Sequence, residues 1–355
     1  MGHDERLFVS GGGGPSAAGV PNRLVECRMD KDRVRIRVEA VYDTGESPIM
    51  SMAYHPSEDR LACGVDDVCH VYAVTRDGLE WEKKVVTSLE DGEYQKCVRF
   101  KPDGRDMVTS GTDGMVKIWP LQDNGVKRTI NAHKCAETDW DKETIDLDVT
   151  NKVVLTVTKN ACKVYKYDEG YMLESLPREA ECYFRGAKFS PEISEVVDSM
   201  PRYVYTCEYK PLTKMWIKRY ETNKWTCEKG LAVQFAKDHP TSFCLSRNGK
   251  LLAVGTAEGF IRVYDASSMQ EMARVSVHRF YIPDMVILEA GSGISSGSFR
   301  TSATCKIASV SGDGTLKLTT VKMRGVRTWT LAFWIAVFVT WILWFFGAEF
   351  RDFYK

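Results

Sequence analysis

The chain has 355 residues, 44% of them hydrophobic, and its 48 basic side chains are balanced by 48 acidic ones. This balance argues against nucleic acid as the main partner, because phosphate binding draws on clustered lysine and arginine. The length and the apolar content suffice for one large domain with a well-packed core, or for two small ones.

The first unusual segment is FVSGGGGPSAAGVPNRLVE, residues 8–26, in which four consecutive glycines lie between two short apolar runs. Gly14 to Gly19 has the GxxxxG spacing of a phosphate-binding loop, but Val20 and Pro21 follow where that loop needs Lys-Ser/Thr. The dinucleotide pattern GxGxxG is also incomplete. The residues alone leave two alternatives open, a flexible turn and a special backbone path with a function, and they favour the flexible turn.

Eleven cysteines are scattered along the chain without a CxxC pair, so we expect reduced and mostly buried thiols in a reducing compartment. The six histidines are scattered as well, which gives no zinc-binding pattern. The first ten residues, MGHDERLFVS, lack the apolar core of a secretory signal, and Arg6 stands where a myristoylation motif needs Ser or Thr. We therefore expect the body of the protein to stay in the cytosol.

A unit consisting of a strand, a tight turn and an alternating strand recurs along the chain. It is clearest in VTSGTDGMVKIWPL from Val108, and a degenerate copy begins at Leu212. The units close every 44 to 55 residues, at Cys27, Tyr72, Trp119, Tyr165, Tyr220, Tyr264 and Thr319. This period resembles that of WD repeats, in which about 40–45 residues form one four-stranded blade. The pattern predicts an all-β fold, a seven-bladed WD-repeat-like β-propeller, with the glycine segment in its first blade.

Polar residues at the turns have a structural interpretation. We expect Asp113 and Asp313 in the turns, and His133 and His278 between blades, to form the hydrogen bonds that hold WD blades together. No GxSxG, HExxH or EF-hand motif occurs. We therefore expect no covalent chemistry, and the protein is predicted not to be an enzyme.

Three further segments interrupt the repeat. Glu174–Arg202 and the Ser/Gly-rich Gly291–Ser302 are expected to be insertions, the second a mobile loop. The acidic segment Glu137–Asp148 is expected to be a solvated loop that leads into a blade rather than a metal site.

The end of the chain has the features of a membrane anchor. Residues 328–348, TWTLAFWIAVFVTWILWFFGA, contain no charged side chain, and as a helix of about 1.5 Å per residue they span about 31 Å, enough to cross a bilayer core. Basic residues precede this segment more often than they follow it, which places the large N-terminal part in the cytosol. We therefore expect a cytosolic propeller at 1–322 with a glycine-rich loop at 10–22, a short basic linker at 323–327, a single C-terminal transmembrane helix at 328–348 and a lumenal tail at 349–355.

This combination resembles one family, the endoplasmic-reticulum membrane guanine-nucleotide exchange factors for the Sar-type GTPase of the COPII coat (the prolactin regulatory element-binding protein family). The resemblance covers nearly the whole chain and rests on GGGG....GVPN, GTDGMVKIW, FCLSRNGKLLAVGTAEGFIRVYD and the anchor. It implies that the protein activates the GTPase by binding, at the endoplasmic reticulum membrane, and so starts assembly of the vesicle coat for export to the Golgi.

The resemblance also implies a function for the glycine segment, because in this family the corresponding loop is shaped by a bound potassium ion and carries much of the exchange activity. The residues carried over to the GTPase-interaction loop are Gly11, Gly12, Gly13, Gly14, Pro15, Ser16, Gly19, Val20 and Asn22, with potassium held by the backbone of Gly11, Gly12, Gly13 and Gly14. Pro15 departs from the family pattern, in which polar or small residues follow the glycines. Two alternatives remain: a membrane-anchored WD-repeat scaffold without exchange activity, and a membrane-bound enzyme that uses the central channel.

Overall fold

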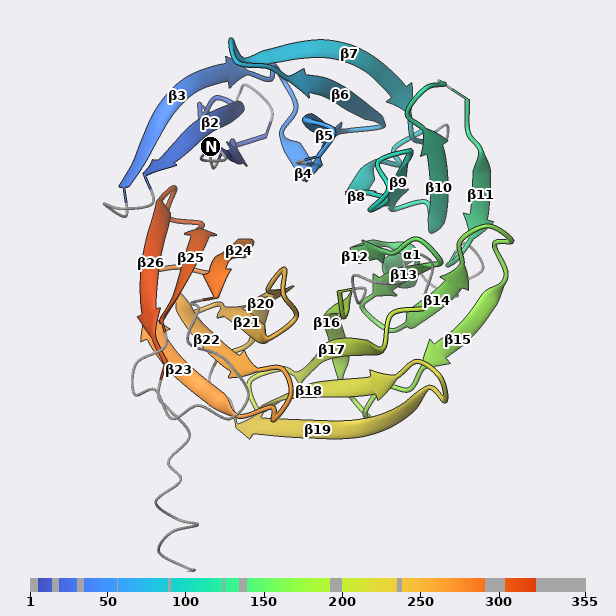
Figure 1. Ribbon diagram of the computed structural model, residues 1–355, viewed down its shortest axis with the longest axis vertical. Helices are drawn as coiled ribbons and strands as arrows, with labels where there is room; N and C mark the ends of the chain where they lie inside the picture. The colour runs from blue at the N-terminus through green and yellow to red at the C-terminus, as the bar shows by residue number, and fades with distance from the viewer. Residues whose placement is uncertain are drawn as a thin grey trace, which may run out of the picture.

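A computed structural model describes residues 6–14, 19–30, 35–55, 57–88, 91–123, 125–133, 139–191, 200–234, 238–290 and 304–323. These residues form seven antiparallel sheets around a central channel (Figure 1). The predicted all-β, seven-bladed propeller is therefore confirmed. The predicted transmembrane segment lies outside the described residues, and within them no helix is long and apolar enough to cross a membrane.

The blades are numbered here in chain order, and their strands have the following bounds. Blades 1 to 3 contain β1 (Arg6–Gly11), β2 (Arg23–Asp30) and β3 (Arg35–Asp43); β4 (Ile49–His55), β5 (Arg60–Val65), β6 (Val68–Val74) and β7 (Leu79–Val86); β8 (Gln95–Phe100), β9 (Asp106–Gly111), β10 (Met115–Pro120) and β11 (Arg128–Asn131). Blades 4 and 5 contain β12 (Thr144–Val149), β13 (Val153–Thr158), β14 (Cys162–Lys166) and β15 (Met172–Leu176); β16 (Tyr183–Phe189), β17 (Tyr203–Lys210), β18 (Lys214–Glu221) and β19 (Thr226–Gln234). Blades 6 and 7 contain β20 (Pro240–Leu245), β21 (Leu251–Thr256), β22 (Phe260–Asp265) and β23 (Glu271–Ser276); β24 (Met285–Ala290), β25 (Thr304–Val310) and β26 (Leu316–Lys322). One short helix, α1 (Asp139–Lys142), precedes β12.

In each four-stranded blade the first strand borders the channel and the fourth lies at the circumference (Figure 1). The second strands β9, β13 and β21 are buried at every residue, because both faces of each sheet are covered by the neighbouring blades. Their sequences DMVTSG, VVLTVT and LLAVGT accordingly do not alternate between polar and apolar residues, as expected for strands buried on both faces.

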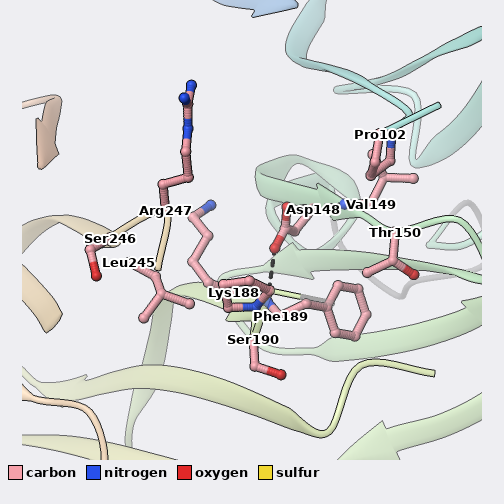
Figure 2. A pocket seen from close by; sticks show the side chains of 11 residues that line it. Pro102, Asp148, Val149, Thr150, Lys188, Phe189, Ser190, Leu245, Ser246 and Arg247 are labelled. Carbon is pink, nitrogen blue, oxygen red and sulfur yellow. Dashed lines mark hydrogen bonds between the residues drawn. The ribbon is translucent and has the colours of Figure 1, made fainter. Parts of the chain in front are cut away.

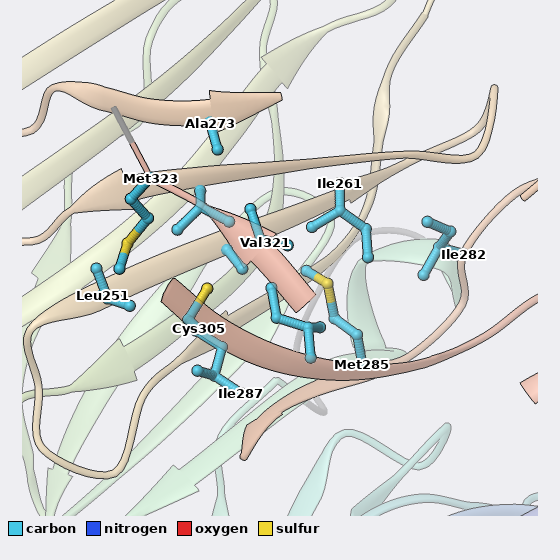
Figure 3. Packing of buried hydrophobic residues seen from close by; sticks show 12 residues of the cluster. Leu251, Ile261, Ala273, Ile282, Met285, Ile287, Cys305, Val321 and Met323 are labelled. Carbon is cyan, nitrogen blue, oxygen red and sulfur yellow. The ribbon is translucent and has the colours of Figure 1, made fainter. Parts of the chain in front are cut away.

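Apolar clusters join each blade to the next. Between blades 6 and 7, Leu251 and Ile261 pack with Met285, Ile287 and Val321 (Figure 3). An equivalent cluster joins every consecutive pair of blades from blade 1 to blade 7. Between blade 7 and blade 1 the described ranges contribute no such cluster.

Blades 1 and 7 have three strands each among the described residues, and the positions of their β-bulges show which strand each lacks. In blade 2 a bulge between the third and fourth strands lies at Tyr72, and the matching bulge in blade 1 lies at Cys27, between β2 and β3. Among the described residues, blade 1 therefore lacks the inner strand. In blade 7 the bulge lies between β24 and β25, where the other blades have the bulge between the first and second strands. Blade 7 therefore lacks the outer strand within the part of the chain that the structure describes.

The sequence-based assignment of the repeats is confirmed, because each closing residue lies on the equivalent strand of a different blade, from Cys27 on β2 to Thr319 on β26. Two local predictions are wrong. Glu174–Arg202 is no insertion, since it includes the end of β15 and all of β16, and Glu137–Asp148 is no loop, since it includes α1 and most of β12. Gly291–Ser302 lies outside the described residues. The ten cysteines in the described ranges are free thiols.

Two of the predicted hydrogen-bonding positions form the expected contacts within blade 7. The imidazole of His278 lies 2.9 Å from Ser309 Oγ, and its Nδ1 lies 3.6 Å from an Asp313 carboxylate oxygen. In blade 3, Asp113 instead accepts a hydrogen bond from Lys117 Nζ at 2.6 Å. His133 is buried and lies 3.4 Å from Thr156 Oγ1 in blade 4.

His133 predicts a loss of stability in mild acid. Burial lowers the pKa of His133 to about 3, whereas an unfolded histidine titrates near pH 6.5. The unfolded state therefore binds the proton first, and the contribution of neutral His133 is complete above about pH 6.5 and falls by about 1.4 kcal/mol per pH unit below it. We expect the difference in unfolding free energy between pH 7.5 and pH 5.5, measured by urea titration, to be smaller in His133→Gln by about 1.4 kcal/mol. The variant His239→Gln, at a less buried histidine, should keep the wild-type difference.

Candidate functional site: the glycine loop

The glycine segment connects β1 to β2 in the first blade, as predicted. Gly11 is the last residue of β1 and pairs with Arg23, the first residue of β2. The connection therefore runs from residue 12 to residue 22, and Gly11 belongs to the strand rather than to the loop. Pro15 and Ser16 lie outside the described residues.

Asn22 holds the two ends of this loop together. Its side-chain amide donates to the carbonyl of Gly14 at 2.8 Å and to the carbonyl of Gly45 at 2.9 Å, while its Oδ1 accepts from the backbone N–H of Gly14 at 3.2 Å. Both amide hydrogens are therefore used, and the side chain is almost completely buried. Asn22 thus links the glycine run to the start of β2 and to the connection between β3 and β4.

The glycines serve different purposes. A β-carbon at Gly12 would lie 2.7 Å from the Asn22 Cα, so any larger residue there collides with the backbone that carries the Asn22 amide. Gly14 and Gly19 have φ angles of 85° and 72°, which L side chains rarely adopt. Just outside these two glycines, the backbone N–H of Gly13 donates to the carbonyl of Val20 at 3.3 Å. The described part of the loop is thus a defined backbone path.

The loop lies at the end of the propeller where the inner strands begin, and we call this end the loop face. Thr44, at the start of the β3–β4 connection, donates its N–H to the Asn22 carbonyl at 3.1 Å. Ser47, in the same connection, donates to the Asp66 carboxylate in the turn between β5 and β6. The opposite end, where the inner strands finish and where β26 ends at Lys322, is called the exit face.

A cavity of about 250 Å³ opens at the exit face and includes Asp148, Lys188 and Arg247 among its lining residues (Figure 2). The ends of the inner strands β12, β16 and β20 form its wall. An enzyme that works in the channel would need polar side chains at one mouth of it that are free to act on a substrate. The contacts of these side chains therefore show whether the cavity could be an active site.

Two of these charged groups, those of Asp148 and Lys188, are bonded to the propeller itself. Lys188 Nζ lies 2.6 and 2.7 Å from the two oxygens of Asp146. Burial raises the pKa of Asp148, but its carboxylate accepts the backbone N–H groups of Val149 at 3.0 Å and Phe189 at 2.8 Å, so it links the inner strands of blades 4 and 5. These contacts assign the cluster to the packing of neighbouring blades.

The described residues contain no group of three or more His, Cys, Asp or Glu side chains that could hold a metal ion. Burial raises the pKa of the thiol of Cys97, on the inner strand β8, to about 11, so that it is a poor nucleophile at neutral pH. The glycine loop is therefore the feature that sets this propeller apart.

Comparisons with known proteins agree with this architecture. The model of the WD domain, G-beta repeat, matches residues 84–120 and 232–265. SEC12-like protein 2 of Arabidopsis thaliana is 23% identical over 333 residues, which cover 88% of this chain and 76% of that protein. SEC12-like protein 1 of the same plant is 22% identical over 64% of this chain and 54% of its own length. A Pre-mRNA-processing factor 19 from Oryza sativa is 25% identical over 72% of this chain but only 45% of its own length.

Seven sheets around a channel, with WD repeats in blades 3 and 6, define a WD-repeat β-propeller protein. The match to Pre-mRNA-processing factor 19 covers less than half of that protein, whereas the match to SEC12-like protein 2 covers 88% of this chain and 76% of that protein. The chain is therefore a WD-repeat propeller that is similar to SEC12-like proteins.

Sequence reasoning identified Asn22 and the glycines but missed their partner, Gly45. The signal was weak: the DTGES segment around Gly45 indicates a turn, but nothing in it indicates contact with a residue 23 positions earlier.

Asn22→Asp tests how the loop is held. The carboxylate retains an acceptor for the Gly14 N–H but cannot donate to the carbonyls of Gly14 and Gly45 and is repelled by both. We expect a loss of about 2–3 kcal/mol in unfolding free energy and faster hydrogen exchange at the Gly14 amide. The control is Asn248→Asp, at a turn where the Asn248 Oδ1 accepts from Ser246 and Lys250 and is preserved by the substitution. Equal losses in the two variants would contradict the role of the Asn22 amide.

Proposed function

We propose that the protein is a guanine-nucleotide exchange factor that activates a small Sar-type GTPase at the endoplasmic reticulum membrane and so starts assembly of the COPII coat. The observation that carries the proposal is the glycine loop, which Asn22 fixes at the first blade of a SEC12-like propeller. The names of the two plant relatives support the family, and the whole-chain resemblance supports the particular GTPase and the membrane.

Exchange of this kind needs no acid or base. A GTPase that binds nucleotide with nanomolar affinity is stabilised in the loaded state by about 12 kcal/mol. An exchange factor that binds the empty GTPase better than the loaded one weakens nucleotide binding by the same factor, because the two equilibria are linked. The protein must therefore present a surface that keeps its shape when it displaces the contacts to the nucleotide. The Asn22 bonds to Gly14 and Gly45 give the loop that property.

Potassium is proposed as a structural ion of the loop. It is held by oxygen ligands, and closely wrapped backbone carbonyls supply these without an acidic side chain. Gly12 and Gly13 lie outside the strand pairing, and the Gly14 carbonyl, which accepts from Asn22, retains a second lone pair. The donor set of this run fits such an ion, and Gly11, which is paired in β1, is the least suited of the four glycines.

The first experiment measures GDP release from the Sar-type GTPase on liposomes that carry the full chain, with Gly12→Ala as the variant. We expect acceleration by the wild type and a decrease of about tenfold or more in Gly12→Ala, because a strain of about 1–3 kcal/mol displaces the loop. Gly230→Ala in β19 is the control, since its β-carbon meets only the Lys218 side chain at 3.8 Å. Binding of the GTPase without acceleration of GDP release would favour the scaffold alternative.

The ion is tested by replacing potassium with N-methylglucamine at constant ionic strength. Loss of the ion should leave the glycine carbonyls to repel one another, so we expect the exchange rate to fall several-fold while the melting temperature of the propeller changes little. An exchange rate that does not depend on the cation would count against the potassium site and leave the exchange function in place.

A further inference from the structure

Several exposed apolar side chains lie on the loop face, in blade 1 and in the blades on either side of it. Phe280 and Tyr281 in blade 7 are 58% and 50% exposed, and Val20 in the loop, Met50 in blade 2 and Val286 in blade 7 are exposed as well. We call these five residues the apolar rim. Contiguous exposed apolar side chains carry a hydration cost and commonly mark a surface that binds another molecule.

The topology places all five residues at the loop face. Phe280 and Tyr281 lie in the connection that leads from β23 into the inner strand β24. Met50 and Val286 are the second residues of β4 and β24, the inner strands of blades 2 and 7. Blade 1, which carries Val20, lies between these two blades in the ring (Figure 1) and has no inner strand in the described ranges. The rim therefore surrounds the glycine loop on both sides.

The aromatic pair is held in place by the turn between β25 and β26. The N–H of Gly312 donates to the carbonyl of Tyr281 at 3.1 Å, and the hydroxyl of Ser311 donates to the carbonyl of Phe280 at 3.2 Å. The Tyr281 ring also lies against Gly312, where a β-carbon would collide with it. These two side chains are thus presented from a fixed backbone, which lowers the entropy lost on binding.

We propose that the apolar rim is the surface that binds the nucleotide-free GTPase, with Phe280 and Tyr281 as its anchors. This inference rests on the proposed function and adds the binding surface to the loop. Phenylalanine, tyrosine and methionine are enriched at the centres of protein interfaces, and a few such residues carry most of the binding energy. Continuity with the loop selects the GTPase as the occupant, because a GTPase that the loop acts on must lie over the adjoining surface.

The rim and the loop then have separable roles. The rim sets how tightly the empty GTPase is held, and the loop sets how fast nucleotide leaves once the GTPase is in place. A change in the rim should therefore alter the concentration of exchange factor that gives half-maximal exchange. A change in the loop should lower the maximal rate.

The test is the double variant Phe280→Ala/Tyr281→Ala in the full chain on liposomes. We expect the half-maximal concentration and the Kd for nucleotide-free GTPase to rise about tenfold or more, with the maximal rate of GDP release within about twofold of the wild type. Both side chains are exposed, so circular dichroism and the melting temperature should match the wild type. The control is Tyr171→Ala/Met172→Ala, an adjacent pair with 54% and 51% exposure at the start of β15 on the exit face, which should change neither quantity.

Each outcome has a distinct meaning. A wild type that neither binds the GTPase nor accelerates GDP release overturns the proposed function and the rim together. A wild type that accelerates release, with the rim variant equal to it or with the exit-face control equally impaired, overturns the rim alone. A dimer of the wild type that Phe280→Ala/Tyr281→Ala converts to monomer would assign the rim to a second copy of the chain and also overturn the proposal.

Discussion

The structure depends on the apolar packing of each sheet against its two neighbours. In the described ranges no blade has a core of its own, since the clusters contain residues from two consecutive blades, and a second strand such as β13 is buried at every residue. This packing also fixes one side of the glycine loop. Leu24, two residues after Asn22, belongs to the cluster between blades 1 and 2, so the strand that follows the loop is held by the core. The loop is therefore held by β2 on one side and by the β3–β4 connection, through Thr44 and Gly45, on the other.

Asn22 fixes the conformation of the glycine loop, a segment whose residues would otherwise favour no single backbone path. Glycine makes the unfolded chain more flexible and loses more entropy on folding than any other residue. The three hydrogen bonds of the Asn22 amide offset part of this cost and choose one path for the described glycines. For an exchange factor this matters, because a loop that yields on contact cannot displace a tightly held nucleotide.

The repeats could be predicted from the sequence because every blade carries a local signal, a tight turn followed by an alternating strand that ends at Tyr72, Trp119 or an equivalent. The misreadings arose where the decisive contact is distant in sequence. Asp146 looks like part of a solvated acidic loop, yet it is buried because Lys188, 42 positions later, neutralises it from the next blade. In the candidate site the glycines and Asn22 were identified, but the sequence did not indicate that Gly45 contacts Asn22 or that Phe280 and Tyr281 lie on the same face of the ring as the loop. Local patterns carry no information about the blade that will lie alongside.

The direction of the last strand gives the molecule a polarity. β26 ends at Lys322 on the exit face, so whatever follows is attached to the side of the ring opposite the glycine loop. Residues 323–327 can extend by at most about 3.6 Å each, or about 18 Å in all. Under the proposed anchoring, the exit face is therefore tethered close to the lipid and the loop is directed outward into the cytosol. The GTPase would then bind its activator on the side of the propeller that faces away from the membrane. Once loaded with GTP, it would have to move past the edge of the propeller to bind the bilayer. Activation and membrane binding would therefore take place on opposite sides of the ring.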